Sequence, residues 1–538
     1  MNLKLKINYE IDPTQPILPQ IMKNRELDLN WANAGESDLL DFSTAKNYEA
    51  GKELILKHIN NNSKIGIYVD SDQDGAASSA IMYQWLKDKN PNLELIAIIP
   101  EGKVHGILEQ LVPEDLDLLI VPDASSNEPR KHKIMNSRNI EVLVLDHHEM
   151  EEENPWSVII NPKNKLCQYK NKWLSGSGVV WKFIRQIDLE NNSDNYKRYA
   201  DLAAIGTVGD VMSLKTMENK AIVNLGIQNI NNPYFQAYLK ADQRVKDKPI
   251  NPILISFYMV PLVNALIRIG DHNLKESLFR ALVGEESAEP IIAQMTSVKG
   301  KQDRTKNNTL PRVVMGLQSS GRDKHSIVFA KSPSTLPKSM TGLVAGQLAS
   351  MYQRPTMLAR EEDDFCIGSL RSINGSTVEN FKDFCEASGM FEFVAGHQGA
   401  AGFKIAKSKV EDFIQYANDN LPPFERIITC DFKLTENKAE VIKQAVEFEN
   451  HVGCDIPALL IYDEFVVDPS EIQIIGKNQN VLKIEKDGIT YIKFNHKDPA
   501  PNYSTKYKIV GKPSLNEWNG DVSSQLIIEH LEWDESIL

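Results

Sequence analysis

The sequence predicts an α/β protein: a doubly wound parallel sheet, a helical linker, a smaller α/β domain and a C-terminal β-barrel. Strand patterns alternate with helical patterns between residues 64 and 161, which is typical of a parallel sheet with right-handed crossovers. These strand patterns are nearly continuous runs of Ile, Leu and Val, as expected where helices cover both faces. Beyond residue 426 short strands recur at nearly regular spacing, which favours a small barrel.

The composition limits the class of protein. The chain has 538 residues, 42% of them hydrophobic and 25% charged, which is ordinary for soluble proteins of several domains. We expect no membrane span, because no run of about 18 apolar residues occurs, and no signal peptide at the N-terminus. Five scattered cysteines without a Cys-x-x-Cys pair argue against disulfides and thiolate zinc sites and favour a cytoplasmic location. The net charge of −13 argues against non-specific coating of nucleic acid.

The first half of the chain supplies the parallel sheet. Residues 1–60 are expected to be an irregular lead-in that ends in a helix over residues 47–60. A helix is expected over residues 76–89, another from residue 176 onwards, and a short one over residues 199–205. The strands of the sheet are expected at residues 65–69, 93–99, 116–121, 142–145 and 158–160.

The second half divides into three parts. Residues 236–310 are expected to be a helical linker. Residues 311–425 are expected to form the smaller α/β domain, with a helix over residues 341–353 between strands at residues 327–330 and 356–358. The barrel is expected over residues 426–538, with strands at 473–475, 481–484, 490–494, 507–510 and 525–529.

Three aspartates follow the first strand directly. Asp70, Asp72 and Asp74 stand at alternate positions before Gly75 and a helix start rich in small residues. Open α/β sheets build their sites at the carboxyl ends of strands. Three carboxylates this close repel one another unless a divalent cation neutralises them. The alternative is a solvated acidic turn that caps a helix.

Three later segments favour the metal interpretation. Asp123 ends the strand pattern at residues 116–121, and Asp146-His147-His148 ends the next one. Asp210 closes the stretch Gly206-Thr-Val-Gly-Asp210. Imidazole and carboxylate together suit Mn²⁺, Fe²⁺, Co²⁺ or Zn²⁺. Chance could place one or two such residues at the ends of apolar runs, but four segments in one α/β stretch point to a metal site.

The order of these motifs resembles the DHH phosphoesterase superfamily. Further stretches resemble its RecJ-type single-strand exonucleases: Asn161-Pro162, Glu218-Asn219-Lys220, Pro261 to Arg268, Cys366 to Ser372, Ala395 to Gly402 and Val510 to Gly520. The resemblance implies a DHH catalytic domain over residues 61–235, a DHHA1 domain over residues 311–425 and an OB-like domain over residues 426–538. It also implies hydrolysis of phosphodiester bonds in single-stranded DNA, 5′→3′, with release of mononucleotides, in DNA repair or recombination.

The resemblance further implies two divalent metal ions, Mn²⁺ in preference to Mg²⁺. Asp72 and Asp123 would hold one ion, and Asp74, Asp123, His147 and Asp210 the other. Among the residues expected to act in catalysis, Asp70 would be a ligand or a partner of one, and Asp146 would orient the histidines. His147 would be a ligand, and His148 would contact the scissile phosphate.

Single-stranded DNA is the partner that the resemblance implies, and a single-strand-binding protein or a helicase is a further expected one. The residues expected to bind DNA or its phosphates, besides His148, are Asn264, Arg268, Arg371, Ser372, Gly396, His397 and Trp518. Taken alone, His397 would be interpreted as a hydrogen-bonded turn histidine. The basic run Lys299 to Lys306 is interpreted first as a solvated helix or loop. The alternative is that its side chains contact phosphates of a nucleic acid.

The chain departs from the family pattern at two metal motifs. Tyr68 stands where many members have a histidine, which puts one metal site in doubt. Asp123-Ala-Ser-Ser stands where Asp-Cys-Gly is common, which puts the backbone after Asp123 in doubt. Two other functions stay open: a phosphodiesterase for short oligonucleotides or cyclic dinucleotides, and a non-catalytic DNA-binding scaffold. Cleavage of long strands, cleavage of dinucleotides or binding alone would separate them.

Overall fold

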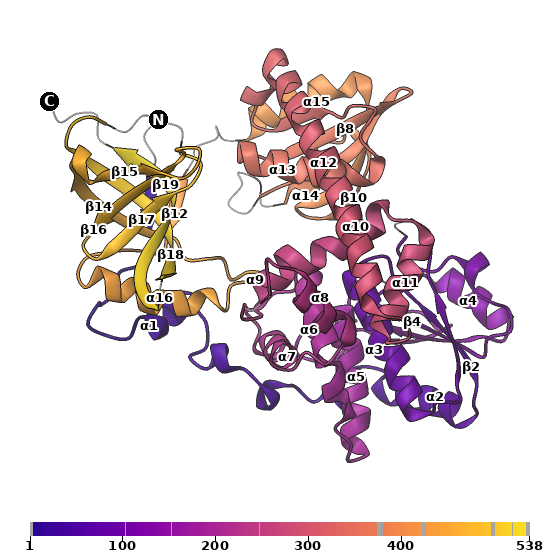
Figure 1. The fold of residues 1–538 in the computed structure, drawn as a ribbon. Coiled ribbons are helices and arrows are strands. Elements are labelled where there is room, and N and C mark those ends of the chain that lie inside the picture. The colour runs from indigo at the N-terminus through magenta and orange to yellow at the C-terminus, as the bar shows by residue number, and fades with distance from the viewer. Residues whose placement is uncertain are drawn as a thin grey trace. The chain divides into compact units, whose positions relative to one another are not determined.

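The computed structural model describes residues 4–533 except 103, 152, 247, 374–377, 379, 422–426, 497–500 and 519 (Figure 1). The chain divides into two compact units. The first unit comprises residues 1–264, 271–293 and 427–538, and the second comprises residues 265–270 and 294–426. The first unit contains the metal motifs and the C-terminal domain, and the second contains the smaller α/β domain.

The predicted parallel sheet is confirmed. Its strands are β2 (Lys64–Tyr68), β3 (Glu94–Ile98), β4 (Leu118–Pro122), β5 (Glu141–Leu145) and β6 (Val158–Ile160). They lie in the order β3-β2-β4-β5-β6, and every pairing is parallel. The chain order reverses direction after β3, because β4 pairs with the other edge of β2. The carboxyl ends of β2, β4 and β5 therefore meet at one edge, which places the acids that follow them close together.

Helices cover both faces of this sheet, as the apolar strands require. Val142 and Val144 of β5 share a hydrophobic cluster with Met135 of α4 (Pro129–Ser137) on one face. On the opposite face Leu143 lies against Gly51 of α2 (Tyr48–Asn60), where a Cβ would come within 3.4 Å of it. The other helices and short helical turns of this part are α3 (Gln73–Lys89), η4 (Glu109–Leu111), α5 (Gly176–Glu190), η5 (Asn195–Tyr199), α6 (Ala200–Gly209) and α7 (Met217–Gln228).

A series of helices follows, as predicted for the linker: α8 (Pro233–Ala241), α9 (Pro252–Leu254), η6 (Ile255–Met259), α10 (Val260–Ile269), α11 (His272–Leu282) and α12 (Ala288–Ser320). Helix α12 runs without a break through the boundary expected at residues 310 and 311, and Pro311 lies inside it. One segment, Pro252–Ile269, is long and apolar enough to cross a membrane by length and composition, and 56% of it is buried. A buried core helix meets the same test, so the segment is weak evidence for a span.

The second unit contains a mixed sheet of five strands in the order β10-β11-β9-β8-β7. Only the pairing of β7 with β8 is parallel, and the others are antiparallel. The strands are β7 (Val328–Lys331), β8 (Thr356–Glu362), β9 (Phe365–Arg371), β10 (Phe391–His397) and β11 (Ala400–Ala406). The helices and turns are η7 (Arg322–Lys324), η8 (Lys338–Met340), α13 (Thr341–Tyr352), α14 (Phe381–Ala387), η9 (Lys407–Lys409) and α15 (Val410–Asn420).

The C-terminal part forms a sheet of seven strands in the order β13-β14-β18-β19-β17-β16-β15. Its two longest strands, β18 (Thr505–Trp518) and β19 (Asp521–Trp533), extend well beyond the predicted ones. Helix α16 (Lys438–Glu449) was not predicted, and it packs against both of these strands. The remaining elements are β12 (Ile427–Cys430), β13 (Phe432–Lys433), β14 (Ile461–Val467), η10 (Pro469–Glu471), β15 (Ile472–Ile475), β16 (Val481–Lys486) and β17 (Ile489–Lys493).

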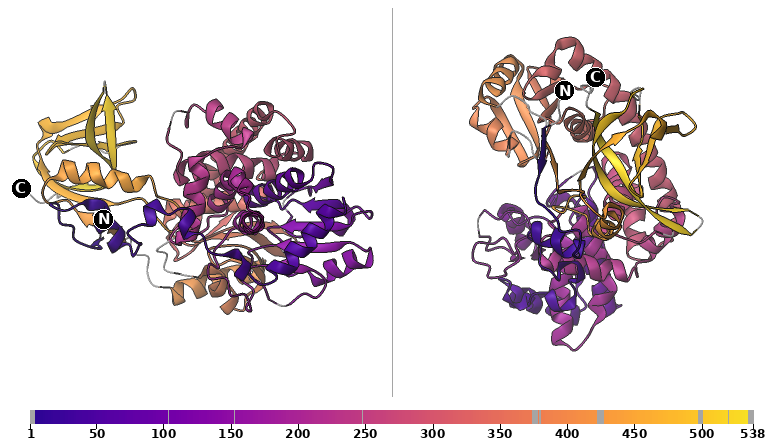
Figure 2. Two further views of the ribbon diagram at one scale, coloured as in Figure 1. Left: turned by 90° about the horizontal axis from the view of Figure 1, so that it is seen from below. Right: turned by 90° about the vertical axis from the view of Figure 1, so that its left-hand side faces the viewer.

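The N-terminal residues are more than an irregular lead-in to the first sheet. Strand β1 (Lys4–Ile7) pairs in parallel with β12, and α1 (Ile17–Asn24) packs against α16 (Figure 1 and Figure 2). The Arg25 guanidinium forms an ion pair with the Asp431 carboxylate at 2.8 Å. The segment between α1 and α2 contains three short turns, η1 (Trp31–Asn33), η2 (Glu36–Asp38) and η3 (Phe42–Thr44). Strand β1, helix α1 and Arg25 therefore pack with the C-terminal domain.

Candidate active site

Metal-ligand side chains gather at the carboxyl edge of the parallel sheet. Within each of three groups, the candidate ligand atoms all lie within 4.8 Å of one another. The groups are Asp123 with His147 and His148, Asp74 with His147 and Asp210, and Asp70 with Asp72 and His105. Every metal-ligand residue predicted from the sequence is in one of these groups. His105 is the one member that the sequence analysis did not select.

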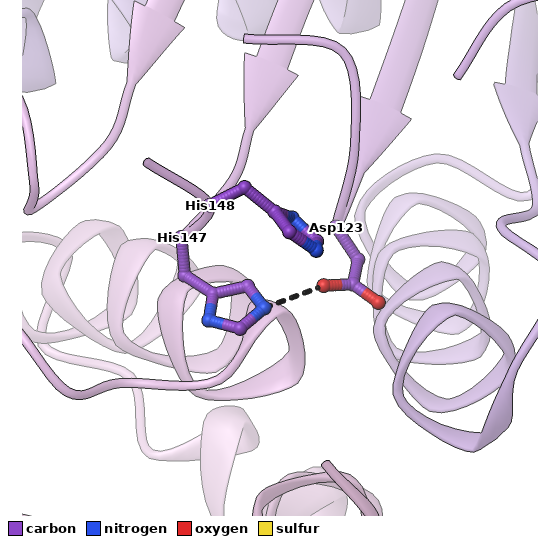
Figure 3. Close-up of side chains that lie close together, drawn as sticks. All are labelled: Asp123, His147 and His148. Atoms are coloured by element: carbon purple, nitrogen blue, oxygen red, sulfur yellow. Dashed lines mark ion pairs between the residues drawn. The ribbon is translucent and has the colours of Figure 1, made fainter. Parts of the chain in front are cut away.

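The centre of the cluster is His147, which belongs to two of the groups. Figure 3 shows it with Asp123 and His148. Its Nε2 atom lies 3.1 Å from Asp123 Oδ1 and 3.3 Å from Asp210 Oδ2. Neither His147 Nε2 nor Asp123 Oδ1 makes a hydrogen bond within the part of the chain that the structure describes, although both atoms are buried. Two ligands on adjacent corners of a metal ion with bonds of about 2.1 Å stand about 3 Å apart. The geometry therefore fits a shared divalent ion.

Asp74 is held by the start of α5. The amide of Gly176 donates to Asp74 Oδ2 at 2.6 Å, and the amide of Ser177 donates to Asp74 Oδ1 at 3.0 Å. Unpaired amides at a helix N-terminus favour a carboxylate. A Cβ on Gly176 would lie 2.3 Å from Asp123 Oδ1, and a Cβ on Gly206 would lie 2.3 Å from Asp74 Oδ1. Both glycines are therefore required by the close approach of carboxylates.

Asp146 is buried beneath the histidines and orients them. Its Oδ1 accepts hydrogen bonds from the amides of His147 and His148 at 2.7 and 3.2 Å, and from His148 Nδ1 at 2.8 Å. Its Oδ2 accepts the Ser126 amide at 3.1 Å. Asn161 Nδ2 donates to the Ser126 hydroxyl and to the His148 carbonyl, both at 2.9 Å, and so ties the two loops together. These are the contacts that the predicted orienting role of Asp146 requires, and the role itself stays a prediction.

The uncompensated acids of the cluster resist ionisation. Burial, together with the charge of Asp72, raises the pKa of Asp74 to about 6. Burial and the charges of Asp74 and Asp72 raise the pKa of Asp210 to about 8. Burial and the charges of Asp74, Asp72, Asp70 and Asp210 raise the pKa of Asp123 well above its usual range. Burial also raises the pKa of Asp70, although His105 opposes the shift. A cation would relieve this repulsion.

The two histidines differ in protonation. Burial and the charge of His148 lower the pKa of His147 to about 3, so that its imidazole is neutral, the form that binds a metal ion. For His148 burial acts in the same direction, but the hydrogen bond and charge of Asp146 outweigh it and raise the pKa of His148 to about 9. The His148 side chain is 44% exposed, whereas that of His147 is 6% exposed. His148 therefore faces the solvent side of the cluster.

The loop after β4 carries backbone strain. Asp123 and Ser125 have φ angles of 65° and 82°, in a region that costs most L-residues about 1–2 kcal/mol. The Ser125 hydroxyl donates to Glu128 Oε2 and lies 3.0 Å from His132 Nε2. These contacts stabilise Ser125 in its left-handed conformation. The departure that put this backbone in doubt is thus accommodated by the Ser125 side chain.

The second unit brings together two of the predicted phosphate-binding arginines. Burial, followed by the charge of Arg268, lowers the pKa of Arg371, and burial lowers the pKa of Arg268. Neither guanidinium forms an ion pair with a residue that the structure describes. Two half-buried guanidinium groups without a carboxylate partner favour the binding of an anion such as a phosphate. The Ser372 amide donates to the Gly399 carbonyl at 2.8 Å, which places Arg371 and Ser372 beside the β10–β11 turn.

The other predicted substrate-binding residues lie on separate elements. Gly396 is in β10 with φ of 136°, where a Cβ would lie 2.7 Å from the Ala400 carbonyl oxygen. The structure describes the backbone of His397, which pairs with Ala400, and that of Trp518, which pairs with Asp521; the roles expected of their side chains lie outside the described residues. Asn264 is a half-buried residue of α10. The basic run Lys299 to Lys306 is in α12, where Lys299 pairs with Asp303 at 2.5 Å.

Two parts of the chain match known families. Residues 64–207 match the DHH family, N-terminal domain, and residues 429–530 match the RecJ OB domain. YorK, an SPβ prophage-derived protein of Bacillus subtilis (strain 168) whose name describes a single-strand DNA-specific exonuclease, is 29% identical over 98% of this chain and 96% of its own. The single-stranded-DNA-specific exonuclease RecJ of the same organism is 24% identical over 92% of this chain and 64% of its own.

A solved structure has the same fold. RecJ from Thermus thermophilus, in complex with Mn²⁺, superimposes with a TM-score of 0.77 over 99% of this chain and 80% of that one, at 19% sequence identity. The correspondence includes the parallel sheet, the second unit and the C-terminal domain. The fold class predicted from the sequence is therefore confirmed.

Proposed function

Because the chain contains a DHH-family domain and a RecJ OB domain, we propose that it is a metal-dependent exonuclease specific for single-stranded DNA. It hydrolyses phosphodiester bonds in the 5′→3′ direction, releases mononucleotides and serves DNA repair or recombination in the cytoplasm. The observation that supports this most directly is the position of His147, which lies within ligand distance of Asp123 in one group and of Asp74 and Asp210 in another. The relatives named above act on the same substrate class by name.

The residues fit two divalent ions, with Mn²⁺ preferred to Mg²⁺. Asp74, Asp123, His147 and Asp210 would hold one ion, and Asp72 with Asp123 and Asp70 the other. Mixed carboxylate and imidazole ligands suit Mn²⁺, whereas Mg²⁺ prefers oxygen ligands and retained water. Bound divalent ions would supply an activated water and neutralise charge on the scissile phosphate. Structures of Thermus RecJ were solved with Mn²⁺ and with Mg²⁺, which supports a divalent ion, and the preference for Mn²⁺ rests on the imidazole ligand.

The chain's own groups orient the substrate and the ligands. His148 has its Nδ1 atom tied to Asp146, which leaves Nε2 on the exposed side of the ring to donate to an oxygen of the scissile phosphate. Asp146 holds both histidine backbones as well as the His148 ring. Loss of Asp146 would therefore disturb a ligand and a phosphate donor at the same time.

The remaining polar residues would bind DNA away from the reacting phosphate. Arg268, Arg371 and Ser372 would contact a phosphate through charge-assisted hydrogen bonds. Gly396 and His397 would belong to the same subsite, with Asn264 beside a neighbouring phosphate and Trp518 stacking on a base. If this subsite binds the 5′ end of the strand, the direction of degradation would be 5′→3′. A single-strand-binding protein or a helicase is the expected protein partner in the pathway.

The test uses single strands of about 40 nucleotides, longer than the site of one OB fold, labelled at the 5′ or the 3′ end and incubated with Mn²⁺ or Mg²⁺. We expect the 5′ label to leave at once as a mononucleotide, the 3′-labelled strand to shorten stepwise, and duplex DNA to resist. The variants Asp146→Ala and His147→Ala should be inactive. Cleavage of dinucleotides alone would indicate a small-substrate phosphodiesterase, and binding without cleavage would indicate a scaffold.

A further inference from the structure

We propose that His105 is a direct ligand of the metal ion held at Asp70 and Asp72, and that it takes over the role of the histidine that Tyr68 replaces. The inference rests on the proposed function, because it concerns the same metal centre. Its basis is the third group of candidate ligands, in which Asp70, Asp72 and His105 place one donor atom each within 4.8 Å of the others.

The sheet brings His105 to this position from a segment that follows a neighbouring strand. Strands β2 and β3 are parallel and in register, with Tyr68 opposite Ile98 at their carboxyl ends. The residues that follow Ile98 therefore leave the sheet at the same edge as Asp70. His105 Nδ1 lies 2.9 Å from Asp70 Oδ2, close to the spacing of about 3 Å expected between adjacent ligands of one ion.

The second carboxylate oxygen of Asp70, Oδ1, is also available to a metal ion. Its side chain is 1% exposed, and its Oδ1 atom accepts no hydrogen bond from any residue in the described ranges. A buried carboxylate oxygen without a donor costs free energy unless a cation or water meets it. Asp72, the N-cap of α3, accepts the Gly75 amide through Oδ1 at 2.9 Å, which fixes its carboxylate at the helix start.

Tyr68 has a different task in this chain. It is fully buried in a hydrophobic cluster, and its hydroxyl accepts the Leu108 amide at 3.1 Å. That contact stabilises the segment that carries His105, three residues before Leu108. Tyr68 thus anchors the loop and supplies no donor to Asp70 or Asp72, so the imidazole that is missing at position 68 is provided by position 105.

The loop around His105 is built to a defined shape. The Ile107 amide donates to Glu128 Oε2 at 2.9 Å. Gly106 has φ of 82°, and a Cβ there would lie 2.4 Å from Glu128 Oε1, so this position requires glycine. The contacts of Gly106 and Ile107 with Glu128 therefore hold the backbone next to His105 in place, as precise metal ligation needs.

The competing explanation is that His105 only donates a hydrogen bond to Asp70 and never binds the ion. Direct ligation and second-sphere support differ in whether a histidine nitrogen is bonded to Mn²⁺. Electron spin-echo spectroscopy of bound Mn²⁺ reports such a nitrogen through its hyperfine coupling. The comparison requires wild-type protein, the variant His105→Gln, and His272→Gln as a control, since His272 is outside all three ligand groups.

We expect wild-type protein to bind two Mn²⁺ ions, counted from the signal of free Mn²⁺ during titration, with histidine nitrogen coupling at both. In His105→Gln one ion should bind at least about tenfold more weakly and lose its nitrogen coupling. The ion at His147 should keep its wild-type affinity and its nitrogen coupling. His272→Gln should match wild type. Unchanged stoichiometry, affinity and nitrogen coupling in His105→Gln would overturn the inference.

Metal binding is measured here without DNA cleavage, so the two hypotheses fail separately. If wild-type protein degrades single-stranded DNA and His105→Gln still binds both ions with nitrogen coupling, only the role of His105 is refuted. If the coupling depends on His105 but no nucleic acid is cleaved, the role of His105 stands and the proposed function is refuted.

Discussion

Gly176 is predicted to control the position of Asp123, so that Gly176→Ala should inactivate the enzyme without unfolding it. Gly176 begins α5, and the side chain of Asp123 packs directly against its Cα. A Cβ at this position would lie 2.3 Å from Asp123 Oδ1 and 2.4 Å from Asp123 Cβ. The same residue donates its amide to Asp74 at 2.6 Å, so α5 cannot move away without weakening that bond.

The size of the effect follows from these distances. Ordinary contact with a Cβ begins near 3.4 Å, so Asp123 must shift by about 1 Å relative to α5. A displacement of about 1 Å in a catalytic centre can lower the rate about 100-fold, which corresponds to about 2.7 kcal/mol of transition-state free energy. Overpacking of this kind destabilises the fold by about 1–3 kcal/mol. Most of the fold should therefore persist while activity is lost.

Gly178→Ala is the matched control, because it adds the same methyl group two residues further along the helix. A Cβ there would meet Ser175 Oγ at 3.4 Å and Leu174 Cδ2 at 3.5 Å, and alanine favours the helix by up to about 1 kcal/mol. Release of the 5′ label is compared at saturating Mn²⁺, and thermal melting reports stability. Gly178→Ala should act at about the wild-type rate. A Gly176→Ala variant that retains wild-type kcat/KM would refute the role assigned to Gly176.

Three further predictions concern stability. Ser125→Gly relieves the strain of a positive φ but removes the hydroxyl group that is bonded to Glu128 and His132. Because these two effects oppose each other, the free energy of unfolding should stay within about 1 kcal/mol of the wild-type value. Ser125→Ala, which loses the bonds and keeps the strain, should be less stable than Ser125→Gly in urea titrations; the reverse order would show that strain is negligible. Burial lowers the pKa of His132 to about 4, below its unfolded value of about 6.5, so the unfolded chain binds its proton first and stability falls as pH drops from 6.5 towards 4. His132→Asn should lose this part of the pH dependence of the free energy of unfolding, and an unchanged slope would contradict the burial of a neutral ring. Lys182→Met leaves the buried Glu218 carboxylate without the ammonium group that lies 2.9 Å away, and should cost about 3–5 kcal/mol. The double variant Lys182→Met/Glu218→Gln should recover part of that loss, and equal stability of the single and double variants would exclude an uncompensated charge as the cause.

The parts of the fold that could be predicted are those that local sequence determines. Four of the five strands of the parallel sheet are apolar runs that are buried along most of their length, β3 at the edge being the exception, and an acid or histidine follows several of the strands directly. The strands β2 to β6 and the candidate ligands Asp123 and His147 follow from this pattern, whereas the apolar run before Asp210 forms helix α6 and not a strand. The strands then only have to be parallel for their ends to meet.

The parts that could not be predicted depend on contacts distant in sequence or on local signals that tertiary structure overrides. Strand β1 pairs with β12 across more than four hundred residues, and nothing in the short stretch Lys4–Ile7 indicates that partner. Pro311 normally ends a helix, yet α12 continues past it. His105 is an isolated histidine in a loop, and only the register of β2 with β3 brings it to Asp70.

Asp123 and Asp146 show how the structure assigns roles that a motif cannot. Both are buried aspartates that follow adjacent parallel strands. Asp146 accepts four hydrogen bonds, and His148 overcomes the effect of burial so that its pKa is lowered. Asp123 Oδ1 accepts none from the residues described and faces His147 Nε2 at 3.1 Å, and its pKa is raised by burial and by four neighbouring acids. Asp146 accepts donors on both oxygens and is bonded to both histidines, whereas a buried oxygen without a donor, such as Asp123 Oδ1, is a position where a cation would relieve the repulsion from neighbouring acids. The donors therefore distinguish the two roles predicted for these acids, Asp146 to orient the histidines and Asp123 to bind a metal ion.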